Sequence, residues 1–157
     1  MNALFNRYAN DIREVVLGEE PMTLPEFVAV CRYDAKVALS PAYERRVRAS
    51  REALEHRLSE KTPIYGVNTG FGGNVDKAVA DEDLVQLQEN ILFSHAVSAG
   101  KPLAREQVRA MLLMMLNVHG HGYSAVRFEF DELARDFLNL EITPYVPVEG
   151  TVGGLSY

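Results

Sequence analysis

The sequence predicts a mainly helical protein with long glycine-rich loops and little strand. Apolar residues recur at helical spacing in residues 41–58, 81–98 and 105–117, and glycines gather in residues 66–73 and 150–154. The length of 157 residues, with 47% hydrophobic and 24% charged residues, is typical of one soluble globular domain. Residues 1–157 are therefore expected to form a single domain.

Charge and hydropathy exclude two classes of partner. Sixteen Lys and Arg against 22 Asp and Glu give a net charge of −6, the wrong sign for a protein that binds a phosphate backbone. No apolar run reaches the roughly 20 residues of a membrane span. The single cysteine, Cys31, cannot form an internal disulfide and is expected to act as a small buried hydrophobe. With no export signal at the N-terminus, the expected compartment is the cytoplasm.

The first elements are predicted from helix-start signals. Thr23 followed by Pro25 is typical of a capped short helix over residues 24–32, and Lys36–Leu39 reads as extended. Ser40 and Pro41 then begin a charged helix that ends near residue 58. Its apolar stripe predicts a surface helix packed by one face and consists of Tyr43, Val47, Leu54 and Leu58.

Residues 64–73 predict an ordered functional loop. Four glycines, with Asn68 and Thr69, make helix improbable there. Tyr65, Val67 and Phe71 interleave with the glycines and can anchor the loop, which a flexible linker would not need.

The remaining segments read as helices joined by turns. Acidic residues open a helix over 81–98, whose predicted face comprises Leu84, Leu87, Ile91 and Val97. Residues 105–117 are apolar nearly all round between Met111 and Leu116, which predicts a buried helix. Its methionines favour a core or subunit contact over an adaptable binding surface. A further helix is expected over 131–140, followed by an extended stretch at 142–148.

Two short motifs contain residue types that occur in binding sites. His119 and His121 are separated by one glycine, but no third ligand follows at a recognised spacing, so a turn is favoured over a metal site. The glycines from Gly70 lack both the Walker lysine and a strand-to-helix context, which disfavours a nucleotide site.

Three segments together resemble the N-terminal part of the aromatic amino acid ammonia-lyases, and most closely the histidine ammonia-lyases. They are YGVNTGFGG at 65–73, LQENILFSHAVSAG at 87–100 and VPVEGTVGGLSY at 146–157, and RAMLLMMLNVHGHGYSAV at 109–126 is similar to the family's buried helix and the turn after it. The resemblance implies the N-terminal domain of the fumarase/aspartase-like superfamily. Because family members are several times longer, it also implies that this chain is a fragment or a truncated relative.

The resemblance implies roles for particular residues. Tyr65 matches the family's catalytic tyrosine, which transfers a proton. Ser94 and His95 fall where the family reads the substrate side chain, and a histidine there is typical of the histidine-specific type. Asn68 and Gly72 are expected to contribute to substrate binding. The implied reaction is elimination of ammonia from L-histidine to give urocanate.

The family's prosthetic group, methylidene imidazolone, forms from an Ala-Ser-Gly tripeptide and supplies the electrophile that side chains lack. Here Gly154, Leu155 and Ser156 occupy those positions, and Leu155 has no hydroxyl to eliminate. No metal is implied. Two alternatives therefore remain open: a non-catalytic member or subunit that binds an aromatic L-amino acid or a partner chain, and an aminomutase. The family also implies a homo-oligomer, a homotetramer in complete enzymes, or here a companion C-terminal chain.

Overall fold

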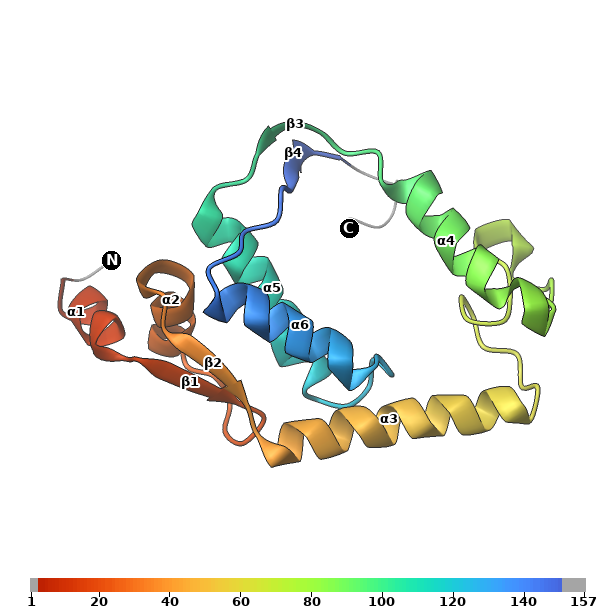
Figure 1. Ribbon diagram of the computed structural model, residues 1–157, viewed down its shortest axis with the longest axis horizontal. Helices are drawn as coiled ribbons and strands as arrows, with labels where there is room; N and C mark the ends of the chain where they lie inside the picture. The colour runs from red at the N-terminus through yellow and green to blue at the C-terminus, as the bar shows by residue number, and fades with distance from the viewer. Residues whose placement is uncertain (1–2, 151–157) are drawn as a thin grey trace. The chain divides into compact units, whose positions relative to one another are not determined.

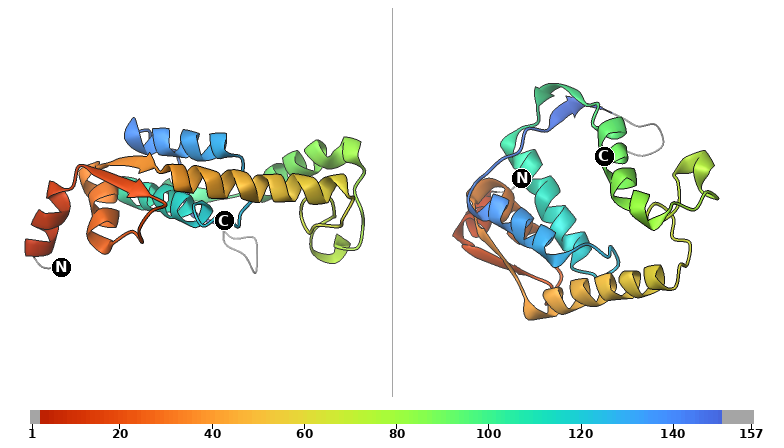
Figure 2. Two further views of the ribbon diagram at one scale, coloured as in Figure 1. Left: turned by 90° about the horizontal axis from the view of Figure 1, so that it is seen from below. Right: turned by 45° about the vertical axis from the view of Figure 1, so that its right-hand side comes forward.

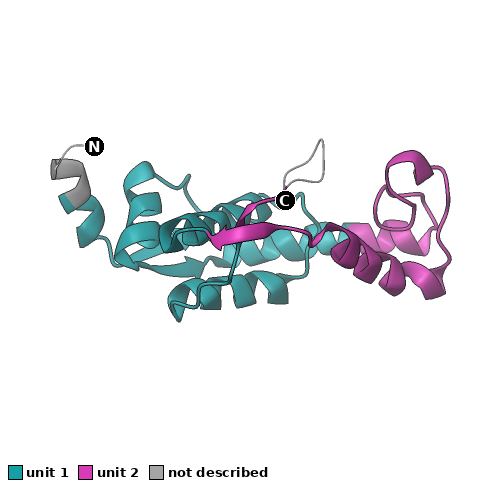
Figure 3. Ribbon diagram, turned by 90° about the horizontal axis from the view of Figure 1, so that it is seen from above, with its two compact units in different colours: residues 1–53, 103–146 teal, residues 54–102, 147–157 magenta. Residues whose placement is uncertain are grey.

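The computed structural model describes residues 3–150, which form two compact units (Figure 3). Unit 1 contains the chain up to Ala53 and Leu103–Val146, and unit 2 contains Leu54–Pro102 and the chain from Pro147. Across the described residues helix is the main secondary structure and strands are few and short, which confirms the predicted fold class (Figure 1).

Most elements belong to unit 1. These are α1 (Ala3–Asp11), β1 (Glu14–Leu17), α2 (Leu24–Tyr33), β2 (Lys36–Leu39), the first part of α3 (Pro41–Ser59), α5 (Arg105–His119) and α6 (Phe128–Asn139). Unit 2 holds the end of α3, the 3-10 turns η1 (Gly72–Asn74) and η2 (Asp81–Asp83), α4 (Leu84–His95), β3 (Ala99–Pro102) and β4 (Pro147–Glu149). The predicted helices at 81–98 and 131–140 are present with shifted ends, because residues 81–83 form the 3-10 turn and α6 begins at Phe128.

The strands of unit 1 form a two-stranded parallel sheet. β1 and β2 pair in register from Glu14 opposite Lys36 to Leu17 opposite Leu39, and α2 lies between them in the chain (Figures 1 and 2). On the other side of β2, the Asn139 side chain accepts a hydrogen bond from Val37 N at 2.8 Å and donates one to Val37 O at 2.9 Å. The last turn of α6 is thereby attached to the sheet.

The predicted helix starts of α2 and α3 are confirmed. At α2, Thr23 N donates to Glu26 Oε2 at 2.7 Å and Glu26 N donates to Thr23 Oγ1 at 3.5 Å, with Pro25 in the first turn. At α3, Tyr43 N donates to Ser40 Oγ at 3.1 Å. The α3 stripe also packs by one face, since Tyr43 and Val47 are buried and Leu54 and Leu58 are partly buried.

The core of unit 1 packs side chains of β1, β2, α2, α3, α5 and α6 together. Its members include Val15, Leu17, Val30, Cys31, Val37, Tyr43, Val47, Leu113, Leu116 and Leu138. Cys31 is only 4% exposed, as expected of a small hydrophobe. Burial raises the pKa of its thiol to about 11, although the nearby Arg109 guanidinium acts in the opposite direction.

The prediction that α5 is buried on all sides was wrong for this structure. Leu113 and Leu116 are fully buried, whereas Met111 is 48% exposed and Met114 is 42% exposed. The apolar run covers every face of the helix, but α2 and α6 pack against only part of it. Periodicity alone could not tell which part.

A buried polar network joins three helices of unit 1. The Asp131 carboxylate lies 2.7 Å from His119 Nδ1 and accepts a hydrogen bond from Tyr43 Oη at 3.0 Å. Tyr43 Oη also lies 2.8 Å from Leu116 O. Burial, with the adjacent Asp131 carboxylate, raises the pKa of Tyr43. His119 is thus a member of a polar network inside unit 1.

Two properties concern the described residues as a whole. Within residues 3–150, no helix is long and apolar enough to cross a membrane. In the same part of the chain, no group of three His, Cys, Asp or Glu side chains could hold a metal ion.

Candidate functional site

The glycine-rich segment of unit 2 is an ordered loop closed on itself. Thr69 and Ala78 form an antiparallel bridge, Gly70 N donates to Lys77 O at 3.0 Å, and Val79 N donates to Asn68 O at 3.0 Å. Gly66 has a φ of +72°, and a Cβ there would lie 3.0 Å from the Phe71 ring. The expectation of an ordered loop is therefore confirmed.

The Asn68 side chain is hydrogen-bonded to the backbone at the start of this loop. Its Oδ1 accepts a hydrogen bond from Ile64 N at 2.7 Å, and its Nδ2 donates to Thr62 O at 2.9 Å. The side chain predicted to bind substrate thus uses both ends of its amide on the backbone of its own loop.

Tyr65 lies on the outside of the loop with its hydroxyl oriented by the backbone. The side chain is 61% exposed and meets the Phe71 ring edge to face, with centroids 6.1 Å apart. Gly72 N donates to Tyr65 Oη at 3.3 Å, and Gly72 has a φ of +54°. Because this contact uses the phenol oxygen as acceptor, it does not consume the hydroxyl proton.

Ser94 and His95 form the last turn of α4. Ser94 Oγ lies 3.1 Å from Ile91 O, and His95 Nδ1 lies 2.8 Å from Ser94 Oγ and 3.0 Å from Ile91 O. His95 also lines a concavity of about 350 Å³ together with Ile91, Leu92, Ala96 and Ser98. An apolar concavity with one imidazole in its wall suits an aromatic ring that carries a polar atom.

Unit 2 brings the tyrosine loop and α4 together through a residue that the sequence did not single out. Gln88 Nε2 donates to Gly66 O at 2.9 Å. Gln88 precedes His95 by seven residues, which places both on one side of α4, and this spacing was the available signal. The contact fixes the loop that carries Tyr65 against the helix that carries His95.

The described chain ends beside the same concavity. Gly150 follows β4 and packs so closely on Ser98 that a side chain at position 150 would collide with the serine hydroxyl. Ser98 is itself part of the concavity wall. The positions predicted to form the prosthetic group, Gly154, Leu155 and Ser156, lie outside the described residues.

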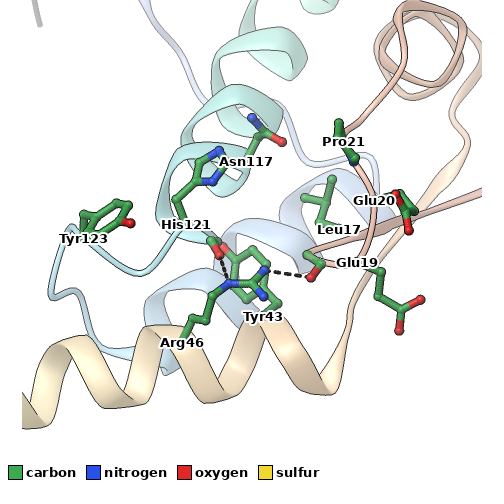
Figure 4. Close-up of a pocket in the computed structure, with 11 residues that line it drawn as sticks. Leu17, Glu19, Glu20, Pro21, Tyr43, Arg46, Asn117, His121 and Tyr123 are labelled. Carbon is green, nitrogen blue, oxygen red and sulfur yellow. Dashed lines mark hydrogen bonds between the residues drawn. The ribbon is translucent and has the colours of Figure 1, made fainter.

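A second cavity, of about 380 Å³, lies in unit 1 (Figure 4). Arg46 crosses its floor and donates to Gly18 O and Gly120 O, each at 2.7 Å. The lining also includes Glu19, Glu20, Pro21, Tyr43, Asn117, His121 and Tyr123. None of the predicted site residues lines it.

The chain is similar to known proteins over most of its length. A family model described as aromatic amino acid lyase matches residues 22–155. The chain is 45% identical to the histidine ammonia-lyase of Symbiobacterium thermophilum over 132 residues, which is 84% of this chain and 26% of that protein. It therefore spans about a quarter of the relative's length.

Solved structures show the same fold. The ergothionase of Treponema denticola matches with a TM-score of 0.83 and 32% identity over 89% of this chain and 28% of that chain. The tyrosine aminomutase of Streptomyces globisporus matches with a TM-score of 0.82 and 32% identity over 89% of this chain and 27% of its own.

Proposed function

Because the chain belongs to the aromatic amino acid lyase family, we propose that it forms the tyrosine loop and the side-chain-recognition part of a histidine ammonia-lyase site. The reaction is elimination of ammonia from L-histidine to give urocanate. The observation that carries the proposal is the Gln88–Gly66 hydrogen bond, which holds the loop of Tyr65 against the helix of His95. In this proposal, residues 1–157 act as one N-terminal domain.

Each residue has a distinct task in this proposal. After loss of its own proton, Tyr65 accepts the β-proton of the substrate on its phenol oxygen, which the Gly72 amide orients. The C–H electron pair becomes the Cα–Cβ double bond as ammonia leaves. His95 exchanges a hydrogen bond with the substrate imidazole, and a hydrocarbon ring offers no such bond. Asn68 keeps the loop in the shape that presents Tyr65.

The chain's own residues do not fit the family's electrophile. Methylidene imidazolone supplies an electrophile made from Ala-Ser-Gly, and formation of its methylidene group requires loss of a serine hydroxyl. Leu155 stands at the serine position and has only a hydrocarbon side chain. Binding and proton transfer are therefore what this chain contributes to the proposed site.

Leu155 also favours a second candidate function from another class. A family member without the electrophile can bind an aromatic L-amino acid, or a partner chain, and leave it unchanged. A third candidate, an aromatic amino acid aminomutase, is favoured by the likeness to tyrosine aminomutase.

We propose that this domain works in the cytoplasm and associates with other chains. It forms either a homo-oligomer, such as the homotetramer of complete family members, or a complex with a companion C-terminal chain. The support comes from exposed apolar side chains on α4: Val85 at 71%, Leu92 at 69% and Phe93 at 81%. Contact with another chain would remove these side chains from water.

The test uses protein purified from its native source, so that any companion chain is retained. A product of L-histidine that absorbs in the near ultraviolet supports the lyase. An isomeric amino acid product without that absorbance supports the aminomutase, and saturable binding without product supports the binding protein. If L-histidine neither binds nor reacts, the histidine ammonia-lyase proposal is wrong. The same result with L-tyrosine and L-phenylalanine would reject the aminomutase and the binding of aromatic amino acids.

Substitution of Tyr65 tests its role within the lyase. Tyr65→Phe is expected to lower the elimination rate by about 10²- to 10⁴-fold, the usual contribution of a positioned acid or base. Tyr123→Phe is the matched control, because that tyrosine is 90% exposed in unit 1 and has no proposed role. Full activity of Tyr65→Phe would reject the assignment.

A further inference from the structure

The hydrogen bonds around His95 restrict where its ring can carry a proton. Nδ1 faces two oxygens, Ser94 Oγ at 2.8 Å and the Ile91 carbonyl at 3.0 Å. A carbonyl oxygen only accepts hydrogen bonds. If Nδ1 were the unprotonated nitrogen, two lone pairs would face each other at hydrogen-bond distance.

The serine hydroxyl completes the arrangement. Ser94 Oγ lies 3.1 Å from the same Ile91 carbonyl, so its proton can be donated there. Its oxygen then accepts from His95 Nδ1. Both distances from Nδ1 agree with one N–H shared between two acceptors, and every proton in this group of three has a partner.

We infer that Ser94, with the Ile91 carbonyl, is a positioning residue that fixes neutral His95 as the Nδ1–H tautomer and so makes Nε2 a hydrogen-bond acceptor. The inference rests on the proposed function for its consequence, since it concerns the same recognition helix. It narrows the substrate class to aromatic amino acids whose side chain carries an N–H or O–H donor. The imidazole of histidine qualifies, and the phenyl ring of phenylalanine does not.

The tautomer can be read directly on the unliganded chain. We would record long-range 1H–15N correlations of 15N-histidine-labelled protein at about pH 8.5, where unperturbed imidazoles are neutral. Loss of a signal in His95→Gln identifies the residue. The expected spectrum shows a protonated Nδ1 and an unprotonated Nε2. A protonated Nε2 would overturn the inference.

Three variants separate the role of Ser94 from a general effect on the wall of the concavity. Ser94→Ala removes one of the two acceptors and is expected to move His95 toward a mixture of tautomers, whereas Ser94→Thr keeps the hydroxyl and the wild-type spectrum. Ser98→Ala is the matched control, because Ser98 lines the same concavity and its hydroxyl is not one of the two oxygens that face His95 Nδ1. An unchanged spectrum in Ser94→Ala would also overturn the inference.

Binding distinguishes failure of this inference from failure of the proposed function. Ser94→Ala is expected to weaken L-histidine binding by about 2- to 10-fold, the usual value of one neutral hydrogen bond, and to leave L-phenylalanine binding unchanged. Equal weakening of both ligands would overturn the inference. A wild-type chain that binds no histidine would overturn the proposed function, while the tautomer spectrum would still decide the role of Ser94.

Discussion

Cys31 makes the stability of unit 1 depend on alkaline pH. Its thiol is 4% exposed, and burial raises its pKa from 9.0 to about 11. In the unfolded chain the thiol ionises near pH 9, whereas in the folded chain it keeps its proton for two further pH units. The folded state therefore binds more protons in this window, and stability falls as pH rises from about 9 to about 11.

The size of the effect follows from the two pKa values. The two values differ by about two pH units, so the full loss is about 3 kcal/mol and the loss between pH 8 and pH 10 is about 1 kcal/mol. With a urea dependence of about 1–3 kcal/mol per molar, the unfolding midpoint shifts by roughly 0.3–1 M.

The contribution of Cys31 to the pH dependence of stability is measured by urea unfolding of wild type and Cys31→Ala at pH 8 and pH 10. Unfolding is followed by far-ultraviolet circular dichroism. The alanine variant is less stable at both pH values because it leaves a small cavity, but that cost does not depend on pH. Tyr43, whose pKa is also raised, is common to both proteins. Equal losses of stability in the two proteins between pH 8 and pH 10 would refute the reasoning.

Three further substitutions test the packing described above. Tyr43→Phe removes a donor from the buried Asp131 carboxylate and is expected to cost about 1–3 kcal/mol in urea unfolding, and an unchanged midpoint would reject the network. Gly120→Ala places a Cβ 2.5 Å from the Tyr43 ring, so we expect a loss of about 1–3 kcal/mol, and wild-type stability would show that the ring moves at no cost. Asn68→Ala should accelerate amide hydrogen exchange within residues 62–79 and leave exchange in unit 1 unchanged. The control variant Asn74→Ala should not accelerate exchange within residues 62–79. Equal exchange rates in the two variants would reject the role of Asn68 in holding the loop.

Local signals predicted the helix starts. A cap at Thr23 or Ser40 acts within four residues, so the side chain and the backbone group that it satisfies are both visible in one stretch of sequence. The α5 helix shows where such reasoning ends. Whether Met111 and Met114 face solvent depends on where α2 and α6 pack against α5, and the apolar run of α5 itself does not contain that information.

The candidate site divides in the same way. Motifs pointed to Tyr65, Ser94 and His95 by residue type and order. The spacing of Gln88 and His95 places both on one side of α4, but it does not show that Gln88 contacts Gly66, 22 residues away. His119 and His121 looked alike in the sequence. The fold separates them, placing one on Asp131 in the core and the other at the cavity of unit 1.

The attachment of Asn139 to β2 affects whether a strand of another molecule can pair with this sheet. Lys36 N and Ser40 N donate toward β1, so Val37 N and O face the opposite edge of the strand. An unpaired edge of this kind is a template on which a strand from another molecule can add. The Asn139 amide supplies one donor and one acceptor to Val37, as a neighbouring strand would. The end of α6 therefore blocks another chain from adding a strand at the β2 edge of this sheet.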